Sequence, residues 1–449
     1  MQRTGDPREG RPGSTVSGQC PRRRVRRMRR TGSLRRMPWI DGERANARAK
    51  GCDACVARAA LRRMPRIDGE RAMPAQKETA MISGLDDVVV AETVLSDVDG
   101  QAGRLVIRGH SLDDLVGHAT YEQVLAMLWE GFFEDLPTHD DLPRHLGAAR
   151  RKVFEHLAAV DAQLLNLTLF DAVRALVARI ADGDDLENAL LLVAAPSVFT
   201  PGILRLQQGL APIPPNPTLG HASDMLHMLH GEPATPERAA ALDRYLITAS
   251  DHGLNASTFV ARIVASTRAG LTSATVAAMS ALKGPLHGGA PGPVLDMLDE
   301  IESAERASSW LEGALARGDR LMGFGHRVYR VRDPRADALK EAVQRLARAG
   351  EVNPNRLRLA EAVEAAALDL LARKKPNRPL QTNTEFYTAL LLEAVGLPRE
   401  AFTCAFAAGR AAGWIAHARE QTLTGRLIRP QSRYVGPQPP SEARSRQRA

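Results

Sequence analysis

From residue 111 almost to the C-terminus, apolar residues recur three and four positions apart, which is the spacing of one buried face of an α-helix. This periodicity predicts helices over residues 121–129, 151–167, 171–181, 186–193, 236–250 and 256–266. The proline-rich stretch 212–217 breaks the pattern, and Gly270 and Gly284 stand where helices would end. We therefore expect an all-α, mainly helical fold with short polar loops.

One segment has the pattern of β-strands. Residues 88–109 contain an apolar run, then Asp99 and Gly100 as a turn, and then the segment 104–108, which predicts a short hairpin. No comparable strand pattern follows in the sequence. A doubly wound α/β sheet is therefore not expected.

The composition excludes several classes of protein. The 449 residues are 44% hydrophobic, which is enough for two or three domains with sizeable cores. No uninterrupted run of about 18 apolar residues occurs, so we expect no membrane-spanning helix. Four cysteines are too few to staple a chain of this length, which argues against a disulfide-built secreted protein. We expect a cytoplasmic protein.

The net charge of +8 is distributed unevenly along the chain. Residues 1–72 carry 20 Lys and Arg against 7 Asp and Glu, a net of +13, whereas the rest carries 40 against 45, a net of −5. These 72 residues show no sustained apolar periodicity, so they cannot bury enough surface to offset their chain entropy. We expect residues 1–72 to be disordered.

Three interpretations of this basic tail stay open. It is translated upstream sequence with the start at Met73 or Met81, a basic arm for nucleic acid or another anionic partner, or an arginine-rich targeting peptide. Its Cys52 and Cys55 have no second pair of metal ligands at a suitable spacing. We expect no metal site there.

Two histidine clusters interrupt the helical pattern. His252 stands in a corner between two helices, where Asn255 or Ser257 could cap the second helix. His287 is flanked by glycines, which let a ligand approach the ring, and a helix is expected from Pro293. The positive end of that helix favours a neutral imidazole, which can donate a hydrogen bond to an enolate-like oxygen. The alternative for His252 is a structural histidine, and the alternative for His287 is a glycine-rich turn with an incidental histidine.

Further candidates lie in the C-terminal third. His326 opens the loop 323–335, which holds four arginines whose guanidinium forks could bind carboxylates or phosphates; a solvated basic loop is the alternative. Glu385 precedes two aromatic residues and could be a base in an apolar pocket or an acid at a helix N-terminus. Arg410 and Arg429, each taken alone, are surface charges or ligands.

Taken together and in this order, these clusters resemble the citrate synthase family. Residues 323–335 look like the family signature, in which Gly-aromatic-Gly-His is followed by Asp-Pro-Arg. The other matching blocks are residues 92–109, 251–257, 283–289, 383–387 and 427–430. The resemblance covers residues 83–437, and bacterial citrate and 2-methylcitrate synthases look most similar.

The resemblance implies a homodimer with a citrate-synthase-like two-domain fold. Cleft closure between the domains would exclude water from the reaction. The implied boundaries are residues 82–288 for the first part of the large domain, 289–396 for the inserted small domain and 397–437 for the second part of the large domain, with tails at 1–72 and 438–449.

The resemblance also implies a role for each catalytic candidate. Glu385 would remove a proton from the methyl group of acetyl-CoA, and His287 would stabilise the resulting enolate. His326 would polarise the carbonyl of oxaloacetate as the carbon–carbon bond forms. Water would then hydrolyse citryl-CoA, with no metal and no cofactor apart from the acyl-CoA substrate.

The remaining candidates are implied to bind the substrates. Oxaloacetate would be held by His252, Arg335 and Arg410. Arg330 would contact the phosphates of CoA, and Arg429 would reach the site of the partner subunit. We expect no membrane partner and no nucleic acid.

The chain departs from the family pattern at one catalytic candidate. Glu385 stands where the best-known members have Asp, and its extra methylene moves the carboxylate by about 1 Å unless the backbone compensates.

Three rival functions stay open beside citrate synthase. The first rival is 2-methylcitrate synthase, which uses propionyl-CoA; it stays open because one methylene is worth only about 1–3 kcal/mol of discrimination. The second is a citryl-CoA-cleaving lyase on the same scaffold. The third is a non-catalytic regulatory protein with a nucleic-acid-binding tail, against which His287, His326 and the arginines weigh.

Overall fold

The computed structural model describes residues 84–85, 88–288, 292–326, 328–329, 331–376 and 380–436. The expectations for residues 1–72, for the cysteine pair in that tail and for residues 438–449 lie outside these ranges. From Leu85 onward the chain forms one compact unit. The domain boundaries at 289 and 396 stay predictions.

The first regular element is the expected hairpin. β1 (Ser96–Asp99) pairs antiparallel with β2 (Arg104–Ile107), with Asp99 opposite Arg104. Leu105 and Ile107 alternate with more exposed neighbours and are buried, as the two-residue period of a half-buried strand requires. A short third strand, β3 (His110–Ser111), adds to the other edge of β2 and was not predicted.

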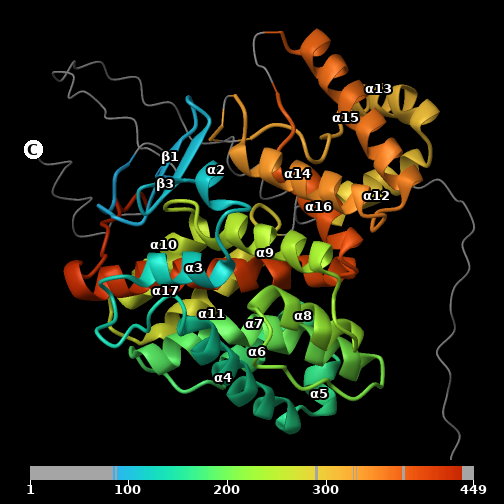
Figure 1. Ribbon diagram of the computed structural model, residues 1–449. Coiled ribbons are helices and arrows are strands. Elements are labelled where there is room, and N and C mark those ends of the chain that lie inside the picture. The colour runs from blue at the N-terminus through green and yellow to red at the C-terminus, as the bar shows by residue number, and fades with distance from the viewer. Residues whose placement is uncertain are drawn as a thin grey trace, which may run out of the picture. The chain divides into compact units, whose positions relative to one another are not determined.

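The other regular elements of the described chain are all helices, as predicted (Figure 1). The helices are α2 (Leu112–Leu115), α3 (Tyr121–Trp129), α4 (Leu142–Glu155), η1 (His156–Ala159), α5 (Ala162–Leu165), α6 (Leu169–Val177), α7 (Leu186–Gln207), α8 (His221–His230), α9 (Pro236–Ser250), α10 (Ala256–Ala265), α11 (Leu271–Leu282), α12 (Gly292–Ile301), η2 (Ala304–Arg306), α13 (Ala307–Ala316), α14 (Pro334–Arg348), α15 (Pro354–Lys374), α16 (Thr384–Ala394), η3 (Arg399–Ala401) and α17 (Phe402–Thr424).

Some predicted bounds are confirmed and others are wrong. The predicted helices 121–129 and 236–250 coincide with α3 and α9. The predicted helix 151–167 is wrong, because α4 ends at Glu155 and α5 starts anew where the side chain of Asp161 accepts the N–H of Leu164. Gly270 does not end a helix; it is the N-cap of α11, at a φ of 98°.

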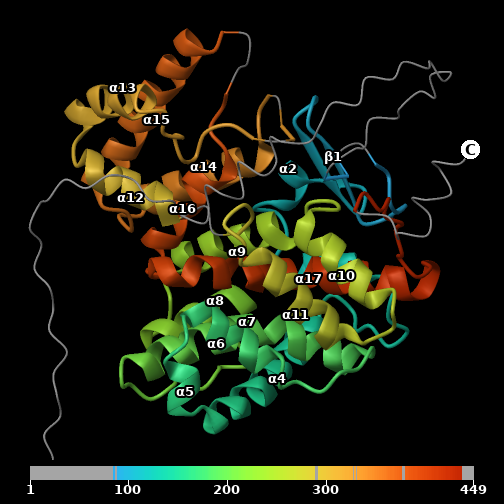
Figure 2. The same ribbon diagram turned by 180° about the vertical axis from the view of Figure 1, so that it is seen from behind.

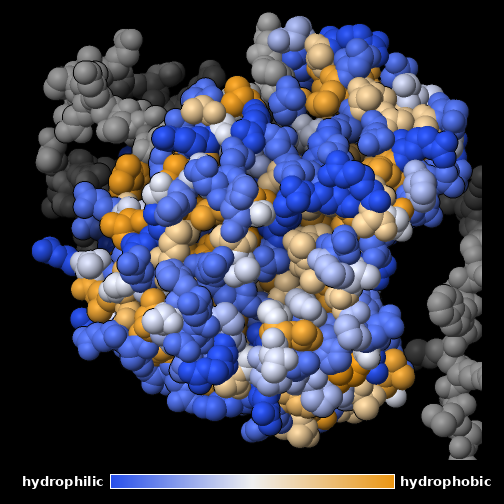
Figure 3. Space-filling view, in the orientation of Figure 1, coloured by the Kyte–Doolittle hydropathy of each residue, from blue (hydrophilic) through white to orange (hydrophobic). Residues whose placement is uncertain are grey.

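The long helix α7 is a core helix. It is the one described helix that is long and apolar enough to cross a membrane, yet 83% of its most apolar window is buried inside the protein. It continues beyond the predicted end at residue 193, past Pro196 and Pro201. The molecular face in Figure 3 is mostly hydrophilic, with apolar side chains in small groups.

Helix α17 crosses the middle of the body, with α9 and α10 on one side and α7 and α11 on the other (Figures 1 and 2). Two glycines let it approach α9 at backbone distance. A Cβ atom at Gly409 would lie 3.0 Å from the carbonyl oxygen of Leu246, and one at Gly413 would overlap that of Ser250. Two side chains of α3 hold the same stretch: Tyr121 donates to the carbonyl of Ala408, and Trp129 donates to a carbonyl one turn further along.

We expect Gly413→Ala to lower the free energy of unfolding by about 1–3 kcal/mol, because the added methyl group forces α17 away from α9. Urea unfolding followed by circular dichroism measures the change. The matched control is Gly313→Ala in α13, where the nearest atom is the flexible end of Arg317 at 3.4 Å. That variant should be unchanged or more stable by up to about 1 kcal/mol. Equal behaviour of the two variants would contradict the close approach.

Candidate active site

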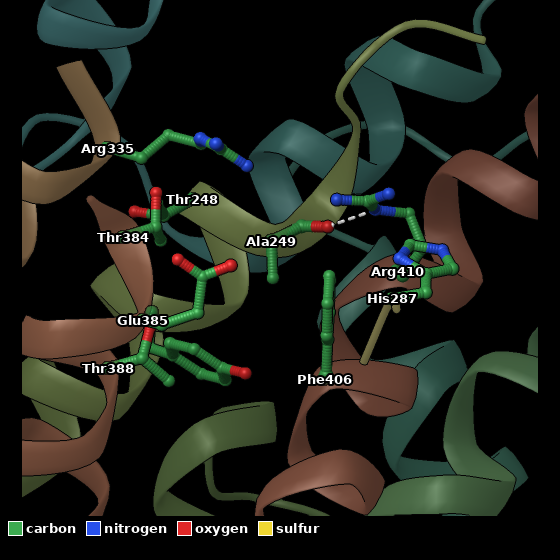
Figure 4. Close-up of a pocket in the computed structure, with 10 residues that line it drawn as sticks. Thr248, Ala249, His287, Arg335, Thr384, Glu385, Thr388, Phe406 and Arg410 are labelled. Carbon is green, nitrogen blue, oxygen red and sulfur yellow. Dashed lines mark hydrogen bonds between the residues drawn. The ribbon is translucent and has the colours of Figure 1, made fainter. Parts of the chain in front are cut away.

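A cavity with about 430 Å³ of empty space lies where α9, α14, α16 and α17 meet the loop after α11 (Figure 4). It is lined by Tyr245, Thr248, Ala249, His287, Arg335, Thr384, Glu385, Thr388, Phe406 and Arg410. Four of these residues are predicted site residues, namely His287, Arg335, Glu385 and Arg410. The fold therefore gathers around one cavity side chains that are spread over residues 287–410 of the sequence.

Glu385 lies in the first turn of α16, and its position is fixed from both sides. The N-cap residue Asn383 accepts the N–H of Glu385 and donates its amide to the carbonyl of Gly325. The carboxylate faces the cavity in Figure 4, and its Oε2 atom is buried without a hydrogen-bond partner among the described residues. Burial raises the pKa of Glu385, and Arg335 opposes that rise in part. A carboxylate in this state is a stronger base than an exposed one.

Asp333, the first residue of the Asp-Pro-Arg motif, holds the side chain of Arg335. Asp333 is the N-cap of α14, and its two carboxylate oxygens accept both the Nε–H and an Nη2–H of Arg335. Thr384 donates to the same carboxylate, which joins α14 to α16. Burial alone would raise the pKa of Asp333, but Arg335 and these hydrogen bonds hold it below its usual value. The guanidinium therefore reaches the cavity in one orientation.

The tautomer of His326 follows from its contacts. Its Nδ1 atom accepts the backbone N–H groups of Val328 and Tyr329, both at 3.0 Å, so the ring proton of the neutral imidazole is on Nε2. Burial, and then Arg335, lower the pKa of His326 to about 4. Its Nε2 lies 3.2 Å from Nη2 of Arg335, and both atoms are donors. The pair thus places two donor nitrogen atoms 3.2 Å apart, and either can donate to an oxygen ligand.

His287 is anchored through Ser257. The Nε2 atom of His287 lies 2.8 Å from Oγ of Ser257, which also accepts the indole N–H of Trp414 and lies 2.8 Å from Oδ1 of Asn255. The hydroxyl of Ser257 donates to Oδ1 of Asn255, which leaves Nε2 of His287 as the donor to Ser257; if the hydroxyl turns to His287 instead, the ring proton is on Nδ1. Burial, and then Arg410, lower the pKa of His287 to about 4, so the ring is neutral near pH 7.

Arg410 closes the cavity from α17. Its Nε–H donates to the carbonyl of Ala249, which is one of the unpaired carbonyls at the C-terminal end of α9. Its guanidinium lies 5.0 Å from the ring centroid of Phe406. Burial lowers the pKa of Arg410 to about 10, so the guanidinium is still a cation near pH 7. The close approach at Gly413 is what lets this side chain reach α9.

His252 adjoins this cavity without lining it. Its Nε2 atom lies 3.1 Å from the hydroxyl of Tyr329, and its ring centroid is 6.1 Å from that of His326. Burial, followed by Arg335 and Arg410, lowers the pKa of His252 well below its usual value. The helix that follows begins with Asn255 as N-cap, one of the two caps predicted.

The structure thus brings six of the eight predicted residues together. His287, Arg335, Glu385 and Arg410 line the cavity, His326 contacts Arg335 in its wall, and His252 packs against His326. Arg429 is exposed on the extended segment after α17 and does not line the cavity of its own chain. Arg330 lies outside the described residues. Among the described residues, no group of three or more His, Cys, Asp or Glu side chains is placed to hold a metal ion.

Sequence reasoning missed three partners of these side chains. Ser257 was considered only as a cap, and Asp333 and Tyr329 were given no role, yet they contact His287, Arg335 and His252 respectively. The Asp-Pro pair was a usable signal for Asp333, because Asp at an N-cap with Pro at the next position is typical of a helix start. No pattern in the sequence connects Ser257 with His287.

Comparisons with known proteins agree on one family. The family model described as citrate synthase, C-terminal domain, matches residues 84–431. A putative citrate synthase 2 of Mycobacterium tuberculosis (strain H37Rv) is 39% identical over 80% of this chain and 94% of its own length. A 2-methylcitrate synthase of Mycobacterium tuberculosis (strain Erdman) is 35% identical over 79% of this chain and 90% of its own length.

A solved structure supports the same family. The citrate synthase of Thermoplasma acidophilum, in a ternary complex with carboxymethyl coenzyme A and oxaloacetate, superposes with a TM-score of 0.68 at 29% sequence identity. The match covers 80% of this chain and 98% of that one. The predicted helical fold is therefore confirmed by a structural relative as well as by the helices themselves.

We expect Asp333→Asn to lower the free energy of unfolding by about 3–5 kcal/mol, because it removes the charge partner of the buried Arg335. Denaturant unfolding at neutral pH measures this loss. Asp337→Asn is the matched control in the same helix turn, since Asp337 pairs with Arg332 and both side chains are about half exposed. Its effect should stay within about 1 kcal/mol. A control as damaging as the test variant would contradict the importance of burial.

Proposed function

Because the chain belongs to the citrate synthase family and is an acyltransferase of that type, we propose that it condenses acetyl-CoA with oxaloacetate and hydrolyses citryl-CoA to citrate and CoA. The observation that carries the proposal is that Glu385, whose buried Oε2 atom has no hydrogen-bond partner within the described ranges, lines one cavity with His287, Arg335 and Arg410. A base, a neutral hydrogen-bond donor and two cations are what this condensation requires.

Oxaloacetate is a dicarboxylate, and the proposal assigns its carboxylates to Arg335 and Arg410. Each guanidinium is oriented by another group, Asp333 in one case and the carbonyl of Ala249 in the other. Such pre-orientation reduces the entropy lost when the anion binds. His252 supplies a further polar contact, and Arg429 of the partner subunit completes the site in the proposed homodimer.

Deprotonation of the acyl-CoA is the first chemical step in this proposal. Glu385 takes a proton from the carbon next to the thioester carbonyl, and the developing enolate oxygen accepts a hydrogen bond from His287. This step requires the ring proton of His287 on Nδ1, so in the proposal the hydroxyl of Ser257 turns from Asn255 to donate to Nε2 of His287. With a pKa of about 4 the ring of His287 is neutral near pH 7, and a neutral imidazole N–H can donate a hydrogen bond to the developing enolate oxygen.

Carbon–carbon bond formation follows at the ketone of oxaloacetate. Nε2 of His326 and Nη2 of Arg335 lie 3.2 Å apart, and in the proposal both donate to the ketone oxygen, which gains negative charge as the enolate carbon attacks. The resulting alkoxide is protonated, Glu385 gives up the proton that it removed, and water then hydrolyses the thioester and frees CoA as the thiol. These residues supply the electrophilic stabilisation themselves, so the proposed reaction uses no metal and no cofactor besides the acyl-CoA.

A second cavity supports binding of the acyl-CoA. It is lined by His326 and has Arg320 and Lys375 among its other lining residues. These cations suit the phosphates of CoA, and Arg330 is assigned to the same task. The Thermoplasma relative was solved with a CoA analogue and oxaloacetate together, which supports the proposed pair of substrates.

A second candidate is 2-methylcitrate synthase, which takes propionyl-CoA instead. It is favoured by the relative of that name, which is 35% identical. The two functions share every residue named above and differ in room for one methylene. The proposed inserted small domain, residues 289–396, closes over either acyl-CoA in the same way.

The decisive experiment measures free-thiol release by the full chain with oxaloacetate and either acetyl-CoA or propionyl-CoA. We expect a higher kcat/KM with acetyl-CoA, since discrimination by one methylene is worth about tenfold or more. A higher value with propionyl-CoA would replace the first function with the second. Release with neither, from a folded protein, would overturn both.

The fall of kcat at low pH should follow the protonation of Glu385. A base acts only when ionised, and burial raises its pKa above the ordinary 4.5, so kcat should begin to fall at a higher pH than for an exposed glutamate. His287 and His326, with pKa values of about 4, stay neutral through that range and do not contribute to the fall of kcat.

The matched variant is His287→Ala, which should lower kcat by about 100- to 1,000-fold because one oxyanion donor is lost. The same fall of kcat at low pH should remain in that variant. A profile in which this fall disappears with His287 would contradict the assignment of the base.

A further inference from the structure

The tip of the N-terminal hairpin lies against the loop that carries His326. A Cβ atom at Gly100 would overlap the carbonyl oxygen of Val328, and one at Gly103 would lie 2.7 Å from that of Arg332. The hairpin and the loop therefore meet backbone to backbone. Arg332 adds a second link, because its guanidinium donates to both carboxylate oxygens of Asp113 in α2.

The first strand of the hairpin holds the other histidine loop. Ser96 in β1 donates its hydroxyl proton to the buried carboxylate of Asp251 and accepts the N–H of Gly253. These two residues stand on either side of His252. Gly253 has a φ of 59°, and a Cβ atom there would meet Val98 of the same strand at 3.1 Å.

The carboxylate of Asp251 is fixed from its far side as well. Arg262 donates to Nδ1 of His417, so the neutral ring of His417 carries its proton on Nε2, which lies 3.2 Å from Asp251. Arg262 also pairs with Glu420, which accepts the N–H of Val94 just before β1. Ser96 and His417 thus both hydrogen-bond Oδ2 of Asp251, whereas Oδ1 is buried without a hydrogen-bond partner among the described residues.

The contacts of Ser96 and of Gly100 both affect the position of the His252 ring. Ser96 fixes the backbone around His252, and the tip at Gly100 fixes the loop whose Tyr329 lies 3.1 Å from Nε2 of His252. We propose that Ser96 and Gly100 are positioning residues for His252, so that the hairpin sets the geometry of the oxaloacetate site. Since His252 is an oxaloacetate ligand only under the function proposed above, this role depends on that function.

Two variants of the full chain test the role. Ser96→Ala removes the hydroxyl, and Gly100→Ala adds a methyl group against Val328 without backbone strain, because Gly100 is not in the left-handed region. We expect each to raise the KM for oxaloacetate by roughly tenfold to a hundredfold, as for small misplacements of a ligand. The KM for the acyl-CoA should change less than about threefold.

The matched controls are neighbours in the same hairpin. Asp97→Asn affects a side chain whose described partner is the exposed Arg104, and Gln101→Ala affects an exposed residue of the turn. Both should keep the KM of the parent protein. Controls that raise the KM for oxaloacetate as much as the test variants would overturn the specific role of Ser96 and Gly100.

A double variant that includes His252→Ala distinguishes a positioning role of Ser96 from a general effect on stability. In the background of His252→Ala, the further change Ser96→Ala should alter the KM for oxaloacetate less than twofold, since its target ring is gone. Effects that simply multiply in the double variant would overturn the proposal. Gly100→Ala in the same background gives an independent answer if Ser96→Ala folds poorly.

A binding measurement distinguishes failure here from failure of the proposed function. Oxaloacetate should raise the melting temperature of the parent protein, and raise it less in Ser96→Ala and Gly100→Ala at equal ligand concentration. Equal rises in parent and variants would overturn the hairpin's role while leaving the function intact. No rise and no thiol release in the parent protein would overturn the function and the hairpin's role together.

Discussion

The approach of α17 to the C-terminal end of α9 is the contact on which the cavity depends. Without side chains at Gly409 and Gly413, the two backbones come close enough for Arg410 to donate to the carbonyl of Ala249. That hydrogen bond satisfies a helix end that burial would otherwise leave unpaired. It also places a cation beside His287, and the same helix end leads directly into the loop that carries His252.

Burial and nearby cations together set the charge states of the site. His287 and His326 each lie near an arginine, and burial with that positive charge keeps both rings neutral. The same burial raises the pKa of Glu385, so one environment favours neutral donors and a stronger base. Both effects serve the proposed enolisation, because its charge develops on the substrate rather than on the protein.

The sequence predicted what depends on local pattern and missed what depends on contacts across the fold. Apolar spacing was enough to find α3 and α9, and a turn pair was enough to find the hairpin. The break before α5 was missed because a single N-cap, Asp161, outweighs a continuing apolar period. The site residues were found through motifs, whereas the partners that orient them, such as Ser257, are identified only by distances between remote segments.

Hydrogen bonds connect Glu385 to the loop of His326, whereas His287 is connected to a different part of the fold. Asn383 caps the helix of Glu385 and bonds the carbonyl of Gly325, next to His326, so these two catalytic candidates share a rigid connection. His287 is tied instead to Ser257 and Trp414 in α10 and α17. A shift between these groups would therefore change the distance from Glu385 to His287 and leave the distance from Glu385 to His326 nearly constant. In the proposed reaction, closure would thus govern deprotonation of the acyl-CoA more directly than polarisation of the ketone.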